Sequence, residues 1–307
     1  MKRSIISICM GLLSIISCST GALSAPLETI FVSILPQKYF MQQICKDSVN
    51  VEVMVAPGAS PHTYEPKPSQ MKKLAASRAY FAIGMPFEVT WLEKFIGVNP
   101  QLKIVNTDAG IERIAMVEHH EEEDNHAKPG RDLGKAAPTE EEHEHGGLDP
   151  HIWLSPLLVK KQAEMMKDAL VGLFPEKASF FQENLAVFTK EIDALDADLR
   201  LLLKGKEGMR FMVFHPSWGY FAKDYGLEQV AVEIEGKEPK PNQMGKLIQQ
   251  AKAQNIHVIF AQPQFSTKSA KLLAKEISGE VVLIDPLAEN WFQNMRQVAE
   301  KLRLTVK

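Results

Sequence analysis

Short apolar runs recur along the chain and alternate with stretches of helical periodicity. One set of four runs lies at 29–35, 49–56, 79–84 and 103–107, and a second set lies at 209–215, 229–234, 257–262 and 281–285. Helical patterns fall near 37–47, 68–77, 88–96, 217–225, 241–254, 266–278 and 290–303. Continuous apolar strands that alternate with helices are typical of parallel sheets covered on both faces. The pattern predicts an α/β fold with two lobes, each with a four-stranded parallel sheet flanked by helices.

Residues 155–204 carry no strand pattern and separate the two sets of strands. Apolar residues recur there at helical spacing, at Phe180, Leu185, Phe188, Ile192, Leu195 and Leu199. At 1.5 Å per residue, a helix over 176–203 would span roughly 42 Å. Such a helix either forms a rigid strut between the lobes or packs within one lobe, and periodicity alone does not separate these alternatives. We expect an N-terminal lobe at 26–175, a linking helix at 176–205 and a C-terminal lobe at 206–307.

The first 25 residues have the three parts of a secretory signal peptide. Lys2 and Arg3 give a positive start, residues 5–16 form an apolar run, and a small-residue cleavage site follows at 22–24. The run is too short to span a bilayer, which takes about 20 apolar residues. We therefore expect export to the periplasm. An alternative is that the segment ending at Cys18 is a lipobox and that Cys18 carries a lipid anchor.

The overall composition is that of a soluble globular protein. The chain has 307 residues, of which 45% are hydrophobic and 24% charged, and its formal net charge is −3. A protein that binds nucleic acid would show a basic face, so this class is disfavoured. Loss of the leader removes Cys9 and Cys18. We expect the remaining cysteine, Cys45, to be a buried residue on the helix near 37–47.

Residues 118–147 differ in composition from both lobes. The segment has ten acidic residues, few apolar ones and five of the nine histidines, which are His119, His120, His126, His143 and His145. Low hydrophobicity and high charge predict a disordered surface loop of the first lobe. A plain solvated loop is one interpretation. Because histidine-rich tracts bind transition metals, we favour auxiliary, weak metal binding by these five imidazoles.

The other four histidines lie at or near the predicted strands. Ligands of open α/β sheets bind at the carboxyl ends of strands. His62 follows the second strand, His215 ends the fifth and Asp285 ends the last, whereas His151 lies between the acidic loop and the middle helices. Three imidazoles and one carboxylate suit a four-coordinate zinc site between the lobes. His257 opens its strand, at the opposite end, and is interpreted as structural.

The sequence lacks the motifs of several common enzyme classes. It has no GxxxxGK[ST], no GxGxxG after a strand, no HExxH and no GxSxG. Catalytic zinc also needs an open coordination position for water, which a site with four protein ligands does not offer. We therefore expect a binding protein and not an enzyme, and a zinc hydrolase is disfavoured.

Five segments resemble the metal-binding, substrate-binding proteins of ABC importers, in the same order along the chain. They read GASPHTYEPKPSQ (58–70), DPHIWLSP (149–156), VFHPSWGYFAKDYGL (213–227), EGKEPKPNQ (235–243) and VVLIDPLAENW (281–291). The His-rich acidic insertion makes the chain most similar to the zinc-specific, ZnuA-type members of cluster A-I. The resemblance covers essentially the whole chain after the leader. It implies two α/β lobes joined by a long rigid helix, with one metal ion between them.

The resemblance also implies a ligand set and a function. The implied metal ligands are His62, His151, His215 and Asp285, in a monomeric periplasmic receptor that delivers Zn²⁺ to a membrane permease with its ATPase. Manganese-binding relatives carry Glu at the position of His215, and imidazole in place of oxygen favours zinc. The alternatives are a manganese or ferrous-ion receptor and a surface adhesin of the same family. Some zinc-binding members have a disulfide, for which Cys45 has no partner once the leader is lost. In some members a water molecule or a loop Glu takes the fourth coordination position of the metal.

Overall fold

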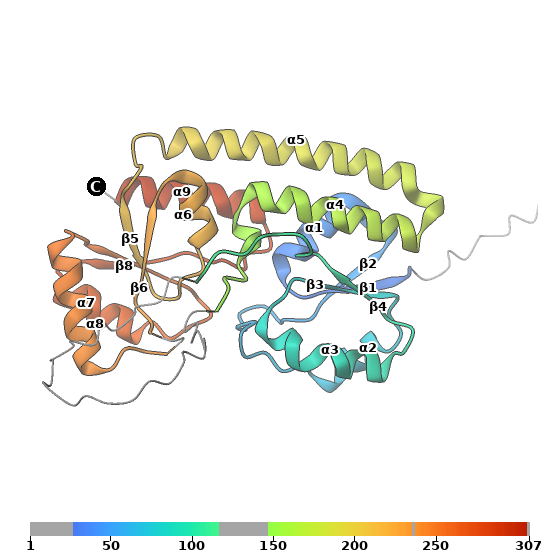
Figure 1. Ribbon diagram of the computed structural model, residues 1–307, viewed down its shortest axis with the longest axis horizontal. Helices are drawn as coiled ribbons and strands as arrows, with labels where there is room; N and C mark the ends of the chain where they lie inside the picture. Colours follow the sequence, from blue (N-terminus) through green and yellow to red (C-terminus); the bar gives the residue numbers. More distant parts are fainter. Residues whose placement is uncertain (1–26, 117–146, 235–236, 306–307) are drawn as a thin grey trace, which may run out of the picture.

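The first lobe is a parallel sheet with helices on both faces (Figure 1). A computed structural model describes residues 27–116, 147–234 and 237–305. The strands are β1 (Thr29–Val32), β2 (Asn50–Val53), β3 (Ala79–Ala82) and β4 (Lys103–Asn106), in the order β2-β1-β3-β4. The connecting helices are α1 (Leu35–Cys45), with a short 3₁₀ turn at Lys46–Ser48, then α2 (Pro68–Leu74) and α3 (Pro86–Val98). In Figure 1, α1 lies on one side of the sheet, and α2 and α3 lie on the other.

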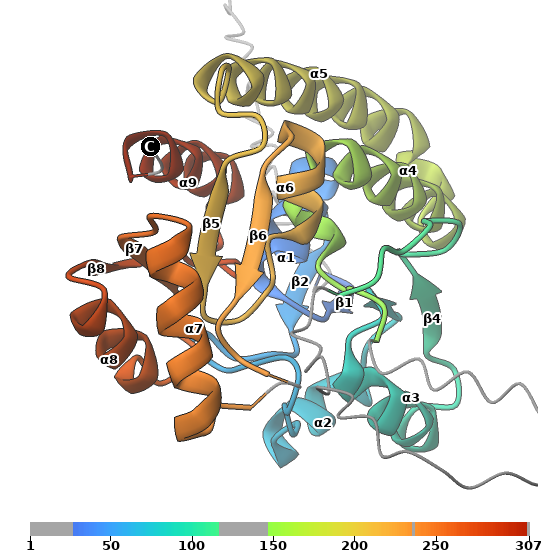
Figure 2. The same ribbon diagram turned by 60° about the vertical axis from the view of Figure 1, so that its left-hand side comes forward.

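The second lobe repeats this architecture. Its strands are β5 (Arg210–Val213), β6 (Glu228–Ala231), β7 (Val258–Ala261) and β8 (Glu280–Leu283), all parallel, in the order β6-β5-β7-β8. Its helices are α6 (Gly219–Tyr225), α7 (Pro241–Ala253), α8 (Lys268–Glu276) and α9 (Trp291–Thr305). Figure 2 shows α7 and α8 on the side of this sheet that faces away from α5. The prediction of two four-stranded parallel sheets flanked by helices is confirmed.

The long middle helix crosses both lobes. α5 (Ala178–Leu202) has 25 residues and follows α4 (Pro156–Leu173) after a 3₁₀ turn at Pro175–Lys177. It packs against α1 and α4 of the first lobe and against α9 of the second, along the top of Figure 1. The helix thus joins the lobes and is also packed along its length.

One residue of the predicted apolar stripe on α5 faces solvent. Phe180 is 42% exposed, whereas Phe181 is fully buried. The buried face continues through Leu185 and Phe188. Phe181 lies four positions before Leu185 and shares its face, whereas Phe180 lies five positions before it and is rotated away. The assignment of Phe180 to the buried stripe is therefore wrong.

The C-terminal helix α9 carries apolar contacts back to the first lobe. The Trp291 ring lies 5.1 Å from the Phe40 ring of α1, and the Phe292 ring lies 6.0 Å from the Phe188 ring of α5. Trp291 and Phe40 are fully buried. Because these rings form one continuous apolar cluster, the two lobes are held together by packing and not by the linking helix alone.

Local sequence explains where several helices begin and end. Pro68, Pro86, Pro156 and Pro241 are the first residues of α2, α3, α4 and α7. Proline suits this position because it has no N–H to leave unpaired and its φ is already helical. α6 ends at Gly226, whose φ of 68° lies in the left-handed region that favours glycine.

Cys45, the last residue of α1, is buried as expected.

Among the described residues, no helix combines the length and apolar character needed to cross a membrane. The predicted leader and its alternative lipid anchor at Cys18 lie outside the described residues.

Candidate metal centre

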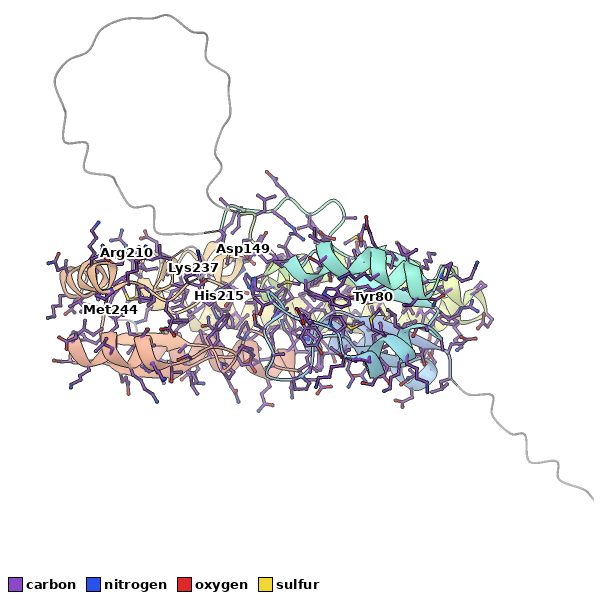
Figure 3. All side chains as sticks on the ribbon, turned by 90° about the horizontal axis from the view of Figure 1, so that it is seen from below. Tyr80, Asp149, Arg210, His215, Lys237 and Met244 are labelled. Carbon is purple, nitrogen blue, oxygen red and sulfur yellow. The ribbon has the colours of Figure 1, made fainter. Side chains whose placement is uncertain are left out.

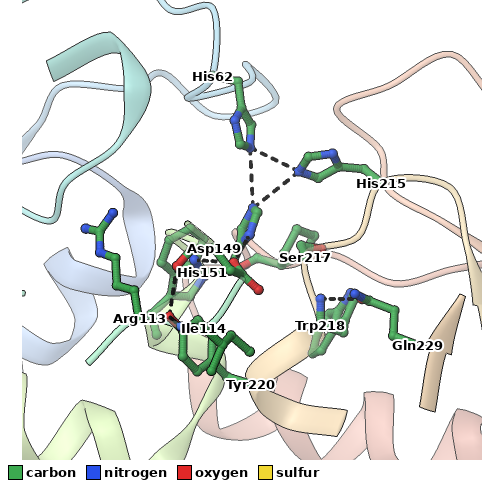
Figure 4. Close-up of polar contacts among 12 residues, drawn as sticks. His62, Arg113, Ile114, Asp149, His151, His215, Ser217, Trp218, Tyr220 and Gln229 are labelled. Atoms are coloured by element: carbon green, nitrogen blue, oxygen red, sulfur yellow. Dashed lines mark hydrogen bonds and ion pairs between the residues drawn. The ribbon is translucent and has the colours of Figure 1, made fainter. Parts of the chain in front are cut away.

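Three histidines from distant parts of the chain converge between the lobes. His62 lies in the loop that follows β2, His151 immediately precedes a 3₁₀ turn (Ile152–Leu154), and His215 lies two residues after β5. Their Nε2 atoms are 3.0 Å apart for His62 and His215, and 3.3 Å apart for each of these with His151. Figure 4 shows the three rings pointing at a common centre. Among the described residues, they are the one group of three or more His, Cys, Asp or Glu side chains whose ligand atoms lie close enough to hold a metal ion.

Buried carboxylates fix the orientation of two of these rings. Asp149 lies 2.7 Å from Nδ1 of His151, and Glu233 lies 2.6 Å from Nδ1 of His215. A carboxylate at Nδ1 favours the tautomer that carries its proton there, which leaves the Nε2 lone pair free for a metal. The acceptor atoms of His151 and His215 are therefore directed at the same point, and a cation there removes their mutual repulsion.

The spacing of the nitrogens fits a single tetrahedral metal ion. Zn–N bonds of about 2.05 Å at tetrahedral angles place two nitrogens about 3.3 Å apart. The observed separations of 3.0 to 3.3 Å agree with this value. Three imidazoles occupy three corners of the tetrahedron, so one corner remains for another ligand.

The centre is enclosed and has room for little more than an ion. His151 and His215 are only 2% and 5% exposed. The cavity that they line has a volume of about 10 Å³, which is about the volume needed by one water molecule. Trp153 lies 5.1 Å from the His151 ring and Phe265 lies 4.8 Å from the His215 ring. An organic substrate does not fit between these walls, whereas a desolvated metal ion does.

Burial keeps the imidazoles of His62 and His151 neutral. Burial, together with the nearby His151 and His215, lowers the pKa of His62 to about 2. Burial also holds the pKa of His151 well below its usual range. Conversely, burial raises the pKa of Asp149 to about 7, although the hydrogen bond that it accepts from the backbone N–H of His151 acts to lower that pKa. Neutral imidazole is the form that binds metal, so protons compete weakly at this site.

Asp285, the fourth residue expected at the site, lies outside this group. Its Oδ1 accepts hydrogen bonds from Nε2 of Gln264 at 2.7 Å and from the N–H of Leu287 at 2.9 Å. Gln264 and Leu287 both line the metal cavity. The carboxylate therefore contacts two residues of the cavity wall, and its role as a ligand stays a proposal.

The remaining histidines are placed as follows. His257 is exposed at the start of β7 and its Nε2 lies 3.1 Å from Oδ1 of Asn255, away from the converging imidazoles. The five histidines of the acidic loop lie outside the described residues, and their metal binding stays a prediction.

Sequence reasoning missed the two carboxylates that orient the histidines. Asp149 stands two residues before His151, so the Asp-Pro-His sequence carried a usable local signal. Glu233 is 18 residues from His215 and reaches it only because β6 pairs with β5. That contact depends on the strand order of the sheet, which no local pattern encodes.

The chain is similar to ZnuA proteins in both sequence and structure. A family model described as ZnuA, zinc-uptake complex component A, periplasmic, matches residues 30–304. A crystal structure of ZnuA is 39% identical with a TM-score of 0.79, over 91% of this chain and 99% of that one. A zinc-bound deletion mutant of ZnuA is 40% identical with a TM-score of 0.78, over 91% of this chain and 98% of that one.

A curated relative extends beyond the matched region. The zinc-binding protein AdcA of Streptococcus pyogenes serotype M3 is 29% identical over 293 residues, which cover 90% of this chain and 55% of that protein. The chain thus spans about half the length of this relative.

Proposed function

Because the chain belongs to the ZnuA family of periplasmic zinc-uptake components, we propose that it is an extracytoplasmic receptor that captures Zn²⁺ between its two lobes. It then delivers the ion to the membrane permease of an ABC importer, which an ATPase drives. The family is one of metal-binding transport components and not of enzymes. The observation that carries the proposal is the convergence of three Nε2 atoms within 3.3 Å of one another, two of them on buried histidines.

Zinc is the preferred cargo because of the donor atoms. Imidazole suits zinc, whereas manganese prefers carboxylate and water oxygens. Three of the four tetrahedral positions are supplied by His62, His151 and His215. We propose Asp285 as the fourth ligand. To bind the metal, Asp285 gives up its hydrogen bonds to Gln264 and Leu287. In the competing arrangement, a water molecule occupies the fourth coordination position.

A competitive titration tests the cargo and the site. The purified protein is stripped of metal and titrated with Zn²⁺ against a chelator of known affinity, with Mn²⁺ in excess. We expect one tightly bound zinc per chain, indifferent to manganese, and a loss of at least about 100-fold in affinity in His215→Ala. His257→Ala, which removes an exposed imidazole away from the site, serves as the matched control and keeps the affinity.

Each contrary result points to a different function or site. Equal or better binding of manganese makes the protein a manganese or ferrous-ion receptor. Tight zinc binding that survives His215→Ala moves the site to the acidic loop. In Asp285→Asn, a loss as large as that in His215→Ala supports Asp285 as the ligand, whereas a small loss favours water.

A further inference from the structure

The first turn of α6, in the second lobe, contacts the segment of the first lobe that leads to His151. The hydroxyl of Tyr220 donates to the carbonyl oxygen of Asp149 at 2.9 Å and accepts from the N–H of Ile114 at 3.2 Å. The N–H of Asp149 in turn donates to the carbonyl of Ile114 at 2.9 Å. One buried hydroxyl therefore joins two neighbouring stretches of the first lobe to the second lobe (Figure 4).

Gly219, at the start of the same turn, leaves room for the Asp149 side chain. A Cβ atom at Gly219 would stand 2.7 Å from Oδ2 of Asp149 and 3.5 Å from Cδ1 of Ile114. Real Cβ atoms do not approach an oxygen so closely, so one of the two groups would have to move. Glycine is the residue that permits such a close approach of backbone to another group.

Asp149 has little freedom to move aside. The residue is 1% exposed, and its Oδ1 already contacts both the backbone N–H of His151 at 2.8 Å and Nδ1 of the same residue at 2.7 Å. Any rotation of the carboxylate away from Gly219 therefore changes its alignment with the His151 ring. Figure 3 shows Asp149 near the middle of the long axis of the molecule, where the lobes meet.

We infer that Gly219 and Tyr220 are positioning residues for zinc capture, which hold the Asp149 carboxylate and through it the His151 ring in the orientation that binds the metal. This inference rests on the proposed function. Residues of the second lobe then set the orientation of His151, a metal ligand that belongs to the first lobe. Since Glu233 orients His215 from within the second lobe, both buried ligands are then aligned by contacts of that lobe.

The size of the effect follows from the role of Asp149. Loss of a group that orients a metal-binding histidine typically weakens metal affinity by 10- to 100-fold. Gly219→Ala should reach this range, because the new methyl group displaces the carboxylate directly. Tyr220→Phe removes the hydroxyl alone and should lower the affinity by up to about 10-fold.

Matched variants separate positioning from general stability. Gly245→Ala adds a methyl group to α7 of the same lobe, where nothing lies within 4 Å. Tyr225→Phe removes a hydroxyl of the same helix that bonds to Asp196 of α5, away from the histidines. The two controls should keep the zinc affinity of the unchanged protein even where they alter its unfolding midpoint.

The test combines a zinc titration with two spectroscopic readouts on folded protein. Zinc affinity is measured by chelator competition, and Co²⁺ is bound in place of zinc because its visible absorption bands report ligand geometry. The imidazole NMR signals of metal-free protein report the His151 ring without any metal. We expect weaker zinc binding, altered Co²⁺ bands and shifted His151 signals in Gly219→Ala and in Tyr220→Phe, and none of these in the controls.

Unchanged affinity, Co²⁺ bands and His151 signals in both variants would overturn the inference. If Gly219→Ala does not fold, Tyr220→Phe decides the question. If the unchanged protein fails to bind zinc tightly, the proposed function fails, but the His151 signals of the metal-free variants still support or refute the positioning role.

Discussion

The metal-free protein should lose stability in acid through His62. The pKa of this imidazole is lowered to about 2 by burial and by its two histidine neighbours, against 6.5 for an ordinary histidine. Below pH 6.5 the unfolded chain therefore takes up a proton at His62, whereas the folded chain does not. Since the unfolded state binds more protons, stability is full above pH 6.5 and is lost as the pH falls.

The magnitude follows from the two pKa values. Each pH unit below 6.5 costs about 1.4 kcal/mol, so His62 alone lowers the free energy of unfolding by about 2 kcal/mol between pH 7.5 and pH 5.0. The figure holds for any folded pKa well below 5. It is a large share of the 5–15 kcal/mol that is typical of folded proteins.

Chemical denaturation of metal-free protein at the two pH values measures this loss. His62→Gln lacks the titrating group, so its stability should fall by about 2 kcal/mol less than that of the unchanged protein. His151 and Asp149 are present in both proteins, so their contributions to the change in the free energy of unfolding cancel in the comparison. His257→Gln, which removes an exposed imidazole, is the control and should follow the unchanged protein.

An equal loss of stability in acid for His62→Gln and for the unchanged protein would refute this prediction. That result would mean that His62 accepts a proton in the folded state and that burial does not keep it neutral. Tryptophan fluorescence and circular dichroism must give the same transition, because two lobes that unfold separately would invalidate a single free energy.

Four further predictions follow from the packing. Burial raises the pKa of the Cys45 thiol to about 12, so a thiol reagent at pH 8 should leave the folded protein unmodified and react once it is unfolded. Phe188→Ala should cost about 3–5 kcal/mol in denaturation experiments, with zinc affinity unchanged, because the ring lies between α1 and α9. In Gly84→Ala, a residue with φ of +78° gains a Cβ only 1.9 Å from Nη2 of Arg113, so we expect a loss of about 2 kcal/mol or more in the same assay. Small-angle scattering should show little change in the radius of gyration on zinc binding, since α5 and α9 pack across both lobes; a marked compaction would contradict this.

Local patterns in the sequence determined the elements of the fold. Apolar runs and helical periodicity located the strands and helices. These signals are local, because the spacing of apolar residues directly reflects the strand and helix repeats. The same reasoning located His62 and His215, since loops at the carboxyl ends of parallel strands are where open α/β sheets bind ligands.

Only the tertiary structure decided how these elements meet. Glu233 orients His215 because β6 pairs with β5, and Tyr220 reaches Asp149 because α6 lies against the other lobe. The same applies to Asp285, which lies two residues after the end of β8 and bonds to Gln264 instead of joining the imidazoles. Contacts between residues far apart in the chain depend on strand order and on the packing of whole elements. The sequence by itself therefore pointed to the three imidazoles, and the packing of the two lobes decided their distances, the carboxylates that align two of them, and the place of Asp285.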